Sequence, residues 1–224
     1  MTRIPLHERK LPLYCRGEEI MNMVTHIVGG SIGLFALILC IIKASLYGNG
    51  YSLAGGIVFG LSMVVLYTMS SIYHGLSRKY TAKKVFQILD HCTIFVLIAG
   101  TYTPVILCSI RPVNPPLAIM MFAVIWGAAI LGIVLNSIDL AHFNKFSMIS
   151  YLCMGWCVIL TGSTAYTSLG FWGFSLILGG GVLYSIGAVF YALTGKKRYM
   201  HAVFHIFVCL ASILHVIAVL FFVI

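Results

Sequence analysis

Seven long apolar stretches, separated by short polar or glycine- and proline-containing breaks, occupy almost the whole sequence. They cover residues 20–46, 52–76, 85–109, 116–137, 146–166, 171–193 and 200–224. A helix needs about 20 mostly apolar residues to cross the hydrocarbon core of a bilayer. The pattern therefore predicts an all-α membrane protein with a seven-transmembrane helix bundle. A short N-terminal segment, 1–17, is expected to precede the membrane domain, 18–224.

Lysine and arginine are distributed unevenly over the predicted loops. The N-terminal segment and the second, fourth and sixth loops contain four, four, one and three of them, whereas the other side has only Lys43 and Arg111. Because cytoplasmic loops of membrane proteins carry the excess of positive charge, this pattern predicts a cytoplasmic N-terminus and an outside C-terminus. We expect a multi-pass protein of the plasma (cytoplasmic) membrane.

Composition supports the same class. Hydrophobic residues make up 61% of the chain and charged residues only 8%, whereas soluble domains have about 25% charged residues. The net charge of +9 is therefore interpreted as topology signals and contacts to anionic lipid headgroups rather than as nucleic-acid binding. Six of the seven cysteines lie in or beside apolar segments, which is typical of small buried side chains rather than metal ligands.

Four polar residues from three predicted helices share one depth in the membrane. His74 lies near the cytoplasmic end of the second helix, and His201 and His205 open the seventh helix. Asp90 follows the start of the third helix by a distance of about 8 Å at 1.5 Å per residue. Burying an unpaired acid in a membrane is costly, so such a residue indicates a functional site.

The spacing of these residues suits a metal ion. In "HAVFH" the two histidines are four residues apart, on one face of a helix, as in helical metal-binding motifs. With His74 as the third ligand, three imidazoles would leave one position open, as in catalytic zinc sites. Ser70 precedes His74 by one helical turn and could donate a hydrogen bond to a substrate.

Each of these residues also has a simpler interpretation. The histidines could lie at the membrane interface without a ligand, and Asp90 could pair with Lys83 or Lys84. Ser70 could bond back to its own helix carbonyl. A polar stripe of Glu19, Asn22, Thr25 and His26 opens the first helix, and its role stays open between helix capping, helix–helix contact and the site. We expect His91 to face elsewhere, and His215 to lie too far along its helix to share a metal.

With these residues in place, the sequence resembles the hemolysin III family, the bacterial branch of the progestin and adipoQ receptor (PAQR) membrane proteins. The resemblance runs from about residue 14 to residue 224. It is carried by "EEIMNMVTH" (18–26), "SSIYHGL" (70–76), "LDHCTIFVLIAGTYTP" (89–104) and "HAVFHIFVCLASILH" (201–215).

The resemblance implies one zinc ion near the cytoplasmic side, bound by His74, His201 and His205. It also implies that Asp90 contacts the metal through water and that Ser70 is the serine of the family motif. Related eukaryotic receptors and the alkaline ceramidases of the wider superfamily are associated with hydrolysis of lipid amides. A ceramide-like lipid is therefore the expected partner.

Three functions follow as hypotheses. The first is a zinc-dependent hydrolase of lipid amides or esters, with Asp90 as general base, because residue 202 is alanine and supplies no metalloprotease-type glutamate. The second is a receptor or regulator without enzyme activity, in which zinc ties two helices together. The third is a cytolysin, as the family name suggests, although the sequence shows no long ring of charges through a bundle. The substrate and the oligomeric state do not follow from the sequence.

Overall fold

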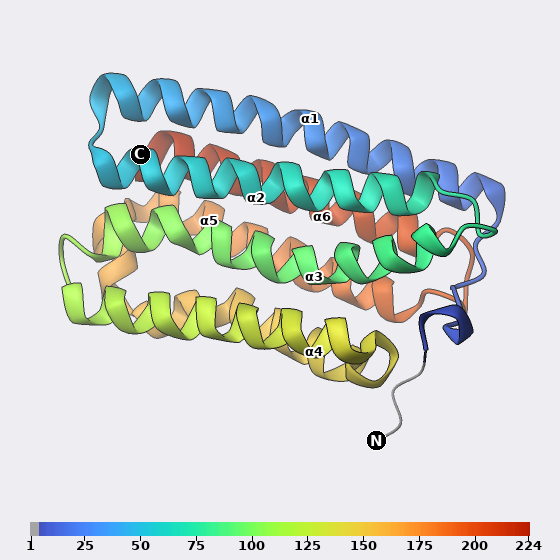
Figure 1. Cartoon of the computed structure of the whole chain (residues 1–224). Helices are drawn as coiled ribbons and strands as arrows, with labels where there is room; N and C mark the ends of the chain where they lie inside the picture. Colours follow the sequence, from blue (N-terminus) through green and yellow to red (C-terminus); the bar gives the residue numbers. More distant parts are fainter. Residues whose placement is uncertain (1–4) are drawn as a thin grey trace.

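Six long apolar helices dominate the computed structural model, which describes residues 5–224 (Figure 1). They are α1 (Arg16–Tyr47), α2 (Gly50–Gly75), α3 (Thr81–Pro104), α4 (Pro115–Trp156), α5 (Ser163–Ala192) and α6 (Met200–Ala218). Each is long and apolar enough to cross a membrane, which confirms the all-α membrane class and a multi-pass integral membrane protein. Residues 1–4 of the predicted N-terminal segment lie outside the described residues.

The longest helix, α4, folds back on itself. Its backbone leaves helical geometry at Asp139 (φ −155°, ψ 96°), and the Asp139 carboxylate accepts hydrogen bonds from two backbone N–H groups of the following turn, as a helix N-cap does. Ser147 Oγ donates to Asn136 Oδ1 at 2.6 Å, although a straight helix would separate these residues by about 16 Å. The predicted segment 116–137 therefore lies in the first half of α4, and the predicted segment 146–166 begins in the second half, which runs antiparallel to the first.

The remaining short elements connect or extend the spans. A 3-10 turn, Leu6–Glu8, lies in the N-terminal segment, and another, Cys157–Thr161, joins α4 to α5. α5 begins at Ser163, within the predicted fifth segment, and its backbone leaves helical geometry at Gly170 (φ 67°, ψ 178°), which lies between the predicted segments 146–166 and 171–193. π-Helical turns continue α3 over Val105–Ile110 and α6 over Val219–Val223. The first of these follows Pro104, which lacks an N–H for the regular helical hydrogen bond.

Glycines hold α1 closely against α2. Gly29 lies under the ring of Tyr67, and a Cβ atom there would come within 2.5 Å of that ring. Gly33 packs in the same way against Met63, where an added Cβ atom would lie 2.8 Å from the methionine side chain. Small residues at such contacts let membrane helices approach each other closely. α1 and α2 therefore pack side by side along their lengths.

One end of the bundle gathers the starts of α1, α3 and α6 and the end of α2 (Figure 1). Glu18, in the first turn of α1, accepts a hydrogen bond from the backbone N–H of Cys15 at 2.8 Å and so caps its own helix. Its other oxygen accepts from the N–H of Tyr199 at 2.7 Å. Tyr199 has a left-handed backbone (φ 63°) and immediately precedes α6. This contact fixes the start of α6 against α1.

Candidate metal centre

Three buried histidines meet at this end of the bundle. His74 lies in the last turn of α2, and His201 and His205 lie in the first two turns of α6. One ligand nitrogen from each lies within 4.8 Å of the other two, and no member of the cluster is more than 5% exposed. The structure brings together the three residues that spacing and depth predicted as ligands, in a cluster that can hold a metal ion.

The ring nitrogens suit a bound cation. His201 Nε2 and His205 Nε2 are 3.1 Å apart, whereas two imidazole nitrogens of a tetrahedral zinc site lie about 3.3 Å apart if each Zn–N bond is close to 2.0–2.1 Å. His74 Nε2 is buried and has no hydrogen-bond partner among residues 5–224. An unpaired buried polar atom costs free energy. A metal ion that accepts the lone pair of His74 Nε2 would remove this cost. The donor set therefore fits a divalent ion that prefers imidazole.

The Nδ1 atoms of two ligands are held by α1. His74 Nδ1 lies 2.7 Å from Glu19 Oε2, and His205 Nδ1 lies 3.2 Å from the backbone oxygen of Asn22. A carboxylate or carbonyl oxygen accepts hydrogen bonds, so each ring is assigned its proton on Nδ1, which leaves Nε2 for a metal. The role of the polar stripe at the start of α1, to which Glu19 and Asn22 belong, was left open by the sequence. The spacing of its residues and their depth in the membrane were the signals that connected it to the site.

His26 is a further member of the site whose role the sequence left open. Its ring stacks on that of His205, with centroids 3.6 Å apart and an interplanar angle of 14°. Both of its ring nitrogens are buried, and in the described part of the chain neither has a hydrogen-bond partner. His26 also lines the cavity described below, so its nitrogens are available to a ligand there.

Asp90 is not one of the three grouped ligands. It is 7% exposed and lines the same cavity as His201 and His205. Of the two lysines predicted as alternative partners, Lys83 and Lys84, Lys83 does not pair with Asp90, because its Nζ lies 2.9 Å from Glu19 Oε1 instead. The expectation that His91 faces elsewhere is wrong.

His91 lines the cavity too, and its Nδ1 is 3.8 Å from Asp90 Oδ2. Consecutive helical residues are rotated by about 100°, and both line this cavity because it is broad. The Nδ1 of His91 also lies 2.9 Å from the carbonyl oxygen of Gln87, one turn earlier.

Ser70 lies one turn before His74 on α2 and is fully buried. Its hydroxyl has no hydrogen-bond partner within residues 5–224. The alternative in which Ser70 bonds back to its own helix is therefore not formed, unlike at Ser71, whose hydroxyl donates to Tyr67 O at 2.7 Å. The Ser70 hydroxyl remains able to donate to a ligand.

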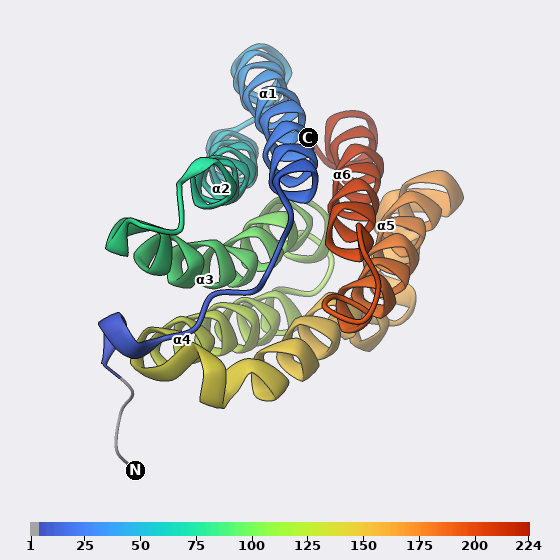
Figure 2. The same cartoon turned by 90° about the vertical axis from the view of Figure 1, so that its right-hand side faces the viewer.

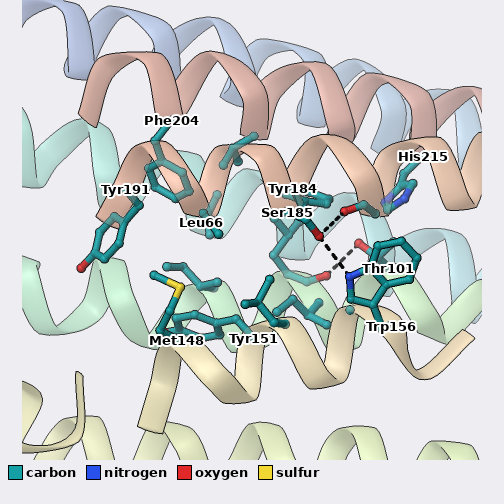
Figure 3. Close-up of a pocket in the computed structure, with 18 of the residues that line it drawn as sticks. Leu66, Thr101, Met148, Tyr151, Trp156, Tyr184, Ser185, Tyr191, Phe204 and His215 are labelled. Atoms are coloured by element: carbon teal, nitrogen blue, oxygen red, sulfur yellow. Dashed lines mark hydrogen bonds between the residues drawn. The ribbon is translucent and has the colours of Figure 1, made fainter. Parts of the chain in front are cut away.

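A largely apolar cavity extends from the histidines into the middle of the bundle. Its volume is about 140 Å³, and its walls include Leu66, Ile94, Leu97, Met148, Phe204 and Val208. Figure 3 shows Tyr191 and Phe204 toward one end and Thr101, Tyr184, Ser185 and His215 toward the other. His215 Nε2 lies 3.2 Å from the carbonyl oxygen of Ile177. His215 also lines the cavity, although it is not one of the three grouped ligands.

Comparison with known proteins identifies the family of the chain. Residues 15–216 match the family model described as "Haemolysin-III related". The chain belongs to the haemolysin-III-related family, which is of the PAQR type. It is 41% identical to "Hemolysin-3" of Bacillus cereus over 206 residues, 92% of each chain. It is 38% identical to "Hemolysin-3 homolog" of Bacillus subtilis (strain 168) over 205 residues, 92% of this chain and 94% of the relative.

The similarity extends to animal proteins at lower identity. The chain is 26% identical to the human "Monocyte to macrophage differentiation factor" over 166 residues, which are 72% of this chain and 67% of the relative. The family model spans all three clustered histidines, together with Ser70 and Asp90. The predicted resemblance to the hemolysin III family is therefore confirmed.

In this haemolysin-III-related chain, the N-terminal segment covers the histidine cluster. Figure 2 shows residues 5–15 of this segment crossing the end of the bundle. The ring of Tyr14 stacks on that of His201, with centroids 5.1 Å apart, and lies 5.8 Å from that of His74. Arg78 donates to the carbonyl oxygens of Pro12 and Tyr14 and holds the segment in place. Burial, reinforced by nearby groups such as Tyr191 and Asp90, raises the pKa of Tyr14, so its hydroxyl stays protonated.

Replacing Tyr14 should open the cluster to solvent. We expect Tyr14→Ala to accelerate metal loss to a chelator by about 3- to 10-fold, because a stacked aromatic pair contributes about 0.5–1.5 kcal/mol beyond its buried area. The measurement is the rate of zinc transfer to a chromogenic chelator from purified protein in detergent. Leu13→Ala is the control, because Leu13 is 86% exposed. Equal transfer rates in Tyr14→Ala and the wild type would contradict a covering role.

Proposed function

We propose that the protein is a zinc-dependent hydrolase of lipid amides, similar in reaction to a ceramidase. The observation that carries this proposal is the cluster of His74, His201 and His205 next to an apolar cavity that also contains Asp90. An imidazole cluster supports a metal, an apolar cavity supports a lipid, and an acid that lines this cavity supports proton transfer. The two Bacillus relatives are named as haemolysins, and that name describes those proteins.

The chain's own residues would divide the chemistry between them. A zinc ion held by the three histidines would supply a Lewis acid that lowers the pKa of water to about 7. Asp90 would accept a proton from the attacking water and return it to the leaving amine. The unpartnered Ser70 hydroxyl would donate a hydrogen bond to the oxygen that becomes negative as the tetrahedral intermediate forms.

The cavity would bind the acyl chain of the substrate. Leu66, Leu97, Phe204 and Val208 offer an apolar wall next to the histidines. The cavity volume of about 140 Å³ is several times the roughly 10–15 Å³ that a cavity needs to hold one water, so the cavity has room for several methylene groups. Burial of each methylene group contributes about 0.8 kcal/mol, so an acyl chain would supply most of the binding energy.

We further propose that the chain crosses the membrane seven times, with its N-terminus in the cytoplasm. The fold-back at Asp139 divides α4 into two halves, and counting them separately gives seven spans. The excess of lysine and arginine at the end that contains the N-terminus supports this orientation. The metal centre would then lie near the cytoplasmic face of the plasma membrane.

A lipid hydrolysis assay tests the proposed function. Protein purified in detergent, with its zinc content measured, is incubated with ceramides and, separately, with phospholipids. We expect release of free fatty acid from the amide-linked lipid, loss of this activity on chelation, and recovery on addition of zinc. Zinc-loaded protein that releases no fatty acid from any amide or ester lipid would contradict a hydrolase.

A second candidate is a regulator in which the metal is structural. It is supported by the position of the ligands, which join α2 to the last helix, α6. Structural zinc sites normally use four protein ligands, whereas the group found here has three. A regulator would turn over no lipid in the same assay. A separate measurement of thermal unfolding would show that chelation lowers its stability.

A further inference from the structure

Helix α1 contributes none of the three clustered histidines, yet it contacts two of them. Glu19 and Asn22 lie three residues apart, on one face of this helix. Glu19 holds the Nδ1 of His74 through its side chain, and Asn22 holds that of His205 through its backbone carbonyl. Of these two contacts, only that of Glu19 depends on the identity of the side chain.

Both oxygens of the Glu19 carboxylate face a polar partner. Oε2 is 2.7 Å from His74 Nδ1, and Oε1 is 2.9 Å from Lys83 Nζ. The amide nitrogen of Asn22 is 3.4 Å from the same His74 nitrogen, and both groups are donors once Nδ1 carries a proton. The short contact to Glu19 therefore decides the orientation of the His74 ring.

Lys83 fixes Glu19 from the opposite side. Its side chain is 1% exposed, and its ammonium group donates to the carbonyl oxygens of Tyr73 and Leu76, each at 2.9 Å. These carbonyls lie at the C-terminal end of α2, where a helix lacks internal donors and attracts positive charge. Lys83 thus caps α2 from α3 and neutralises Glu19. The carboxylate is held between two helices before any metal binds.

We propose that Glu19 is a positioning residue for the metal centre, with His74 between its carboxylate and the metal ion. This inference rests on the proposed function, because it requires that the three histidines bind a metal. A carboxylate that accepts the Nδ1 proton fixes the ring and its tautomer, and it makes Nε2 a stronger ligand. The Nε2 of His74, which lacks a protein partner within the described chain, is then aimed at the metal position.

Metal affinity measured in two variants tests this role. Glu19→Ala removes both the charge and the hydrogen bond, and we expect it to weaken binding of Zn²⁺ or Co²⁺ by about 10- to 100-fold. Glu19→Gln keeps an oxygen that accepts from His74 but loses the charge, so its affinity should lie between those of Glu19→Ala and the wild type. Competition with a chelator gives the affinities. The visible absorption of bound Co²⁺ reports whether Glu19→Gln restores the coordination geometry that Glu19→Ala disturbs.

Glu18→Gln is the matched control. Glu18 is a buried carboxylate beside Glu19, and it accepts from the backbone N–H groups of Cys15 and Tyr199. Glutamine keeps one oxygen that can accept from the N–H of Cys15, as in a capping box, but its amide nitrogen cannot accept the second bond, from the N–H of Tyr199. This variant therefore loses one negative charge and one backbone contact at the same helix start but keeps the contact of Glu19 with His74, and we expect its loss of metal affinity to be smaller than that of Glu19→Gln.

The outcomes separate this inference from the proposed function. Wild-type metal affinity in both Glu19 variants would overturn the positioning role. A lower melting temperature of the metal-free variants would not rescue it, because a loss of stability alone would show only a structural role for Glu19. Equal losses of metal affinity in Glu18→Gln and Glu19→Gln would also overturn it, because the loss of any negative charge at the start of α1 would then explain the effect. A wild-type protein that binds no metal would remove the metal centre itself.

Discussion

Asp90→Asn is expected to lower lipid hydrolysis by about 10²- to 10⁴-fold, the usual contribution of a general acid–base residue. Asparagine has nearly the same shape as aspartate but accepts no proton from the attacking water. Because Asp90 is not one of the three grouped ligands, the zinc content should stay at the wild-type value. The measurements are fatty acid release from a ceramide and zinc content by mass spectrometry, on the same preparation.

Asp139→Asn is the control for this substitution. Asp139 is the other aspartate of the chain, and it caps the second half of α4. Asparagine serves equally well at an N-cap, so this variant should keep both its fold and its activity. Wild-type turnover in Asp90→Asn would show that another group moves the proton, and His91, 3.8 Å away, would be the next residue to replace.

His205→Ala is expected to abolish stable metal binding. It leaves two of the three ligands, and the affinity should fall by more than about 100-fold, since loss of a residue behind a ligand already costs 10- to 100-fold. The variant should be purified with little zinc, and added zinc should no longer raise its melting temperature. Zinc content and thermal unfolding in detergent, with and without added zinc, provide the test.

His142→Ala is the matched control for the loss of an imidazole. His142 is exposed and lies just after the break in α4, so its removal should leave zinc content unchanged. Full zinc occupancy in His205→Ala would mean that the metal binds elsewhere or that another group replaces the histidine. His26, which stacks on His205 with 3.6 Å between ring centroids, is the nearest alternative ligand, and a His26→Phe/His205→Ala double variant would identify it.

The long apolar helices and the three clustered histidines follow from the sequence because they depend on position along the chain. Apolar length predicts where helices cross, and the distance from a helix end gives depth. His74, Asp90 and His201 could be placed in one layer for this reason. Depth does not require knowledge of how each helix is rotated.

Helix rotation is what the sequence could not supply. Whether Glu19 faces His74, or His26 faces His205, depends on how α1 packs against α2 and α6, and that packing is set by close contacts such as Gly29 against Tyr67. The spacing of polar residues on α1 indicated a shared face but no partner. His91 was misplaced for the same reason, because the breadth of the cavity beside α3 depends on the neighbouring helices.

The division of the ligands between α2 and α6 has a consequence for biosynthesis. His74 emerges from the ribosome long before His201 and His205, which belong to the last helix. Chains are made from the N-terminus at roughly 5–20 residues per second, so the full set of ligands exists only after synthesis of the chain is almost complete. Loading of the proposed metal would therefore be a late step of biogenesis, and a bound ion would mark a chain whose final helix has been inserted and docked.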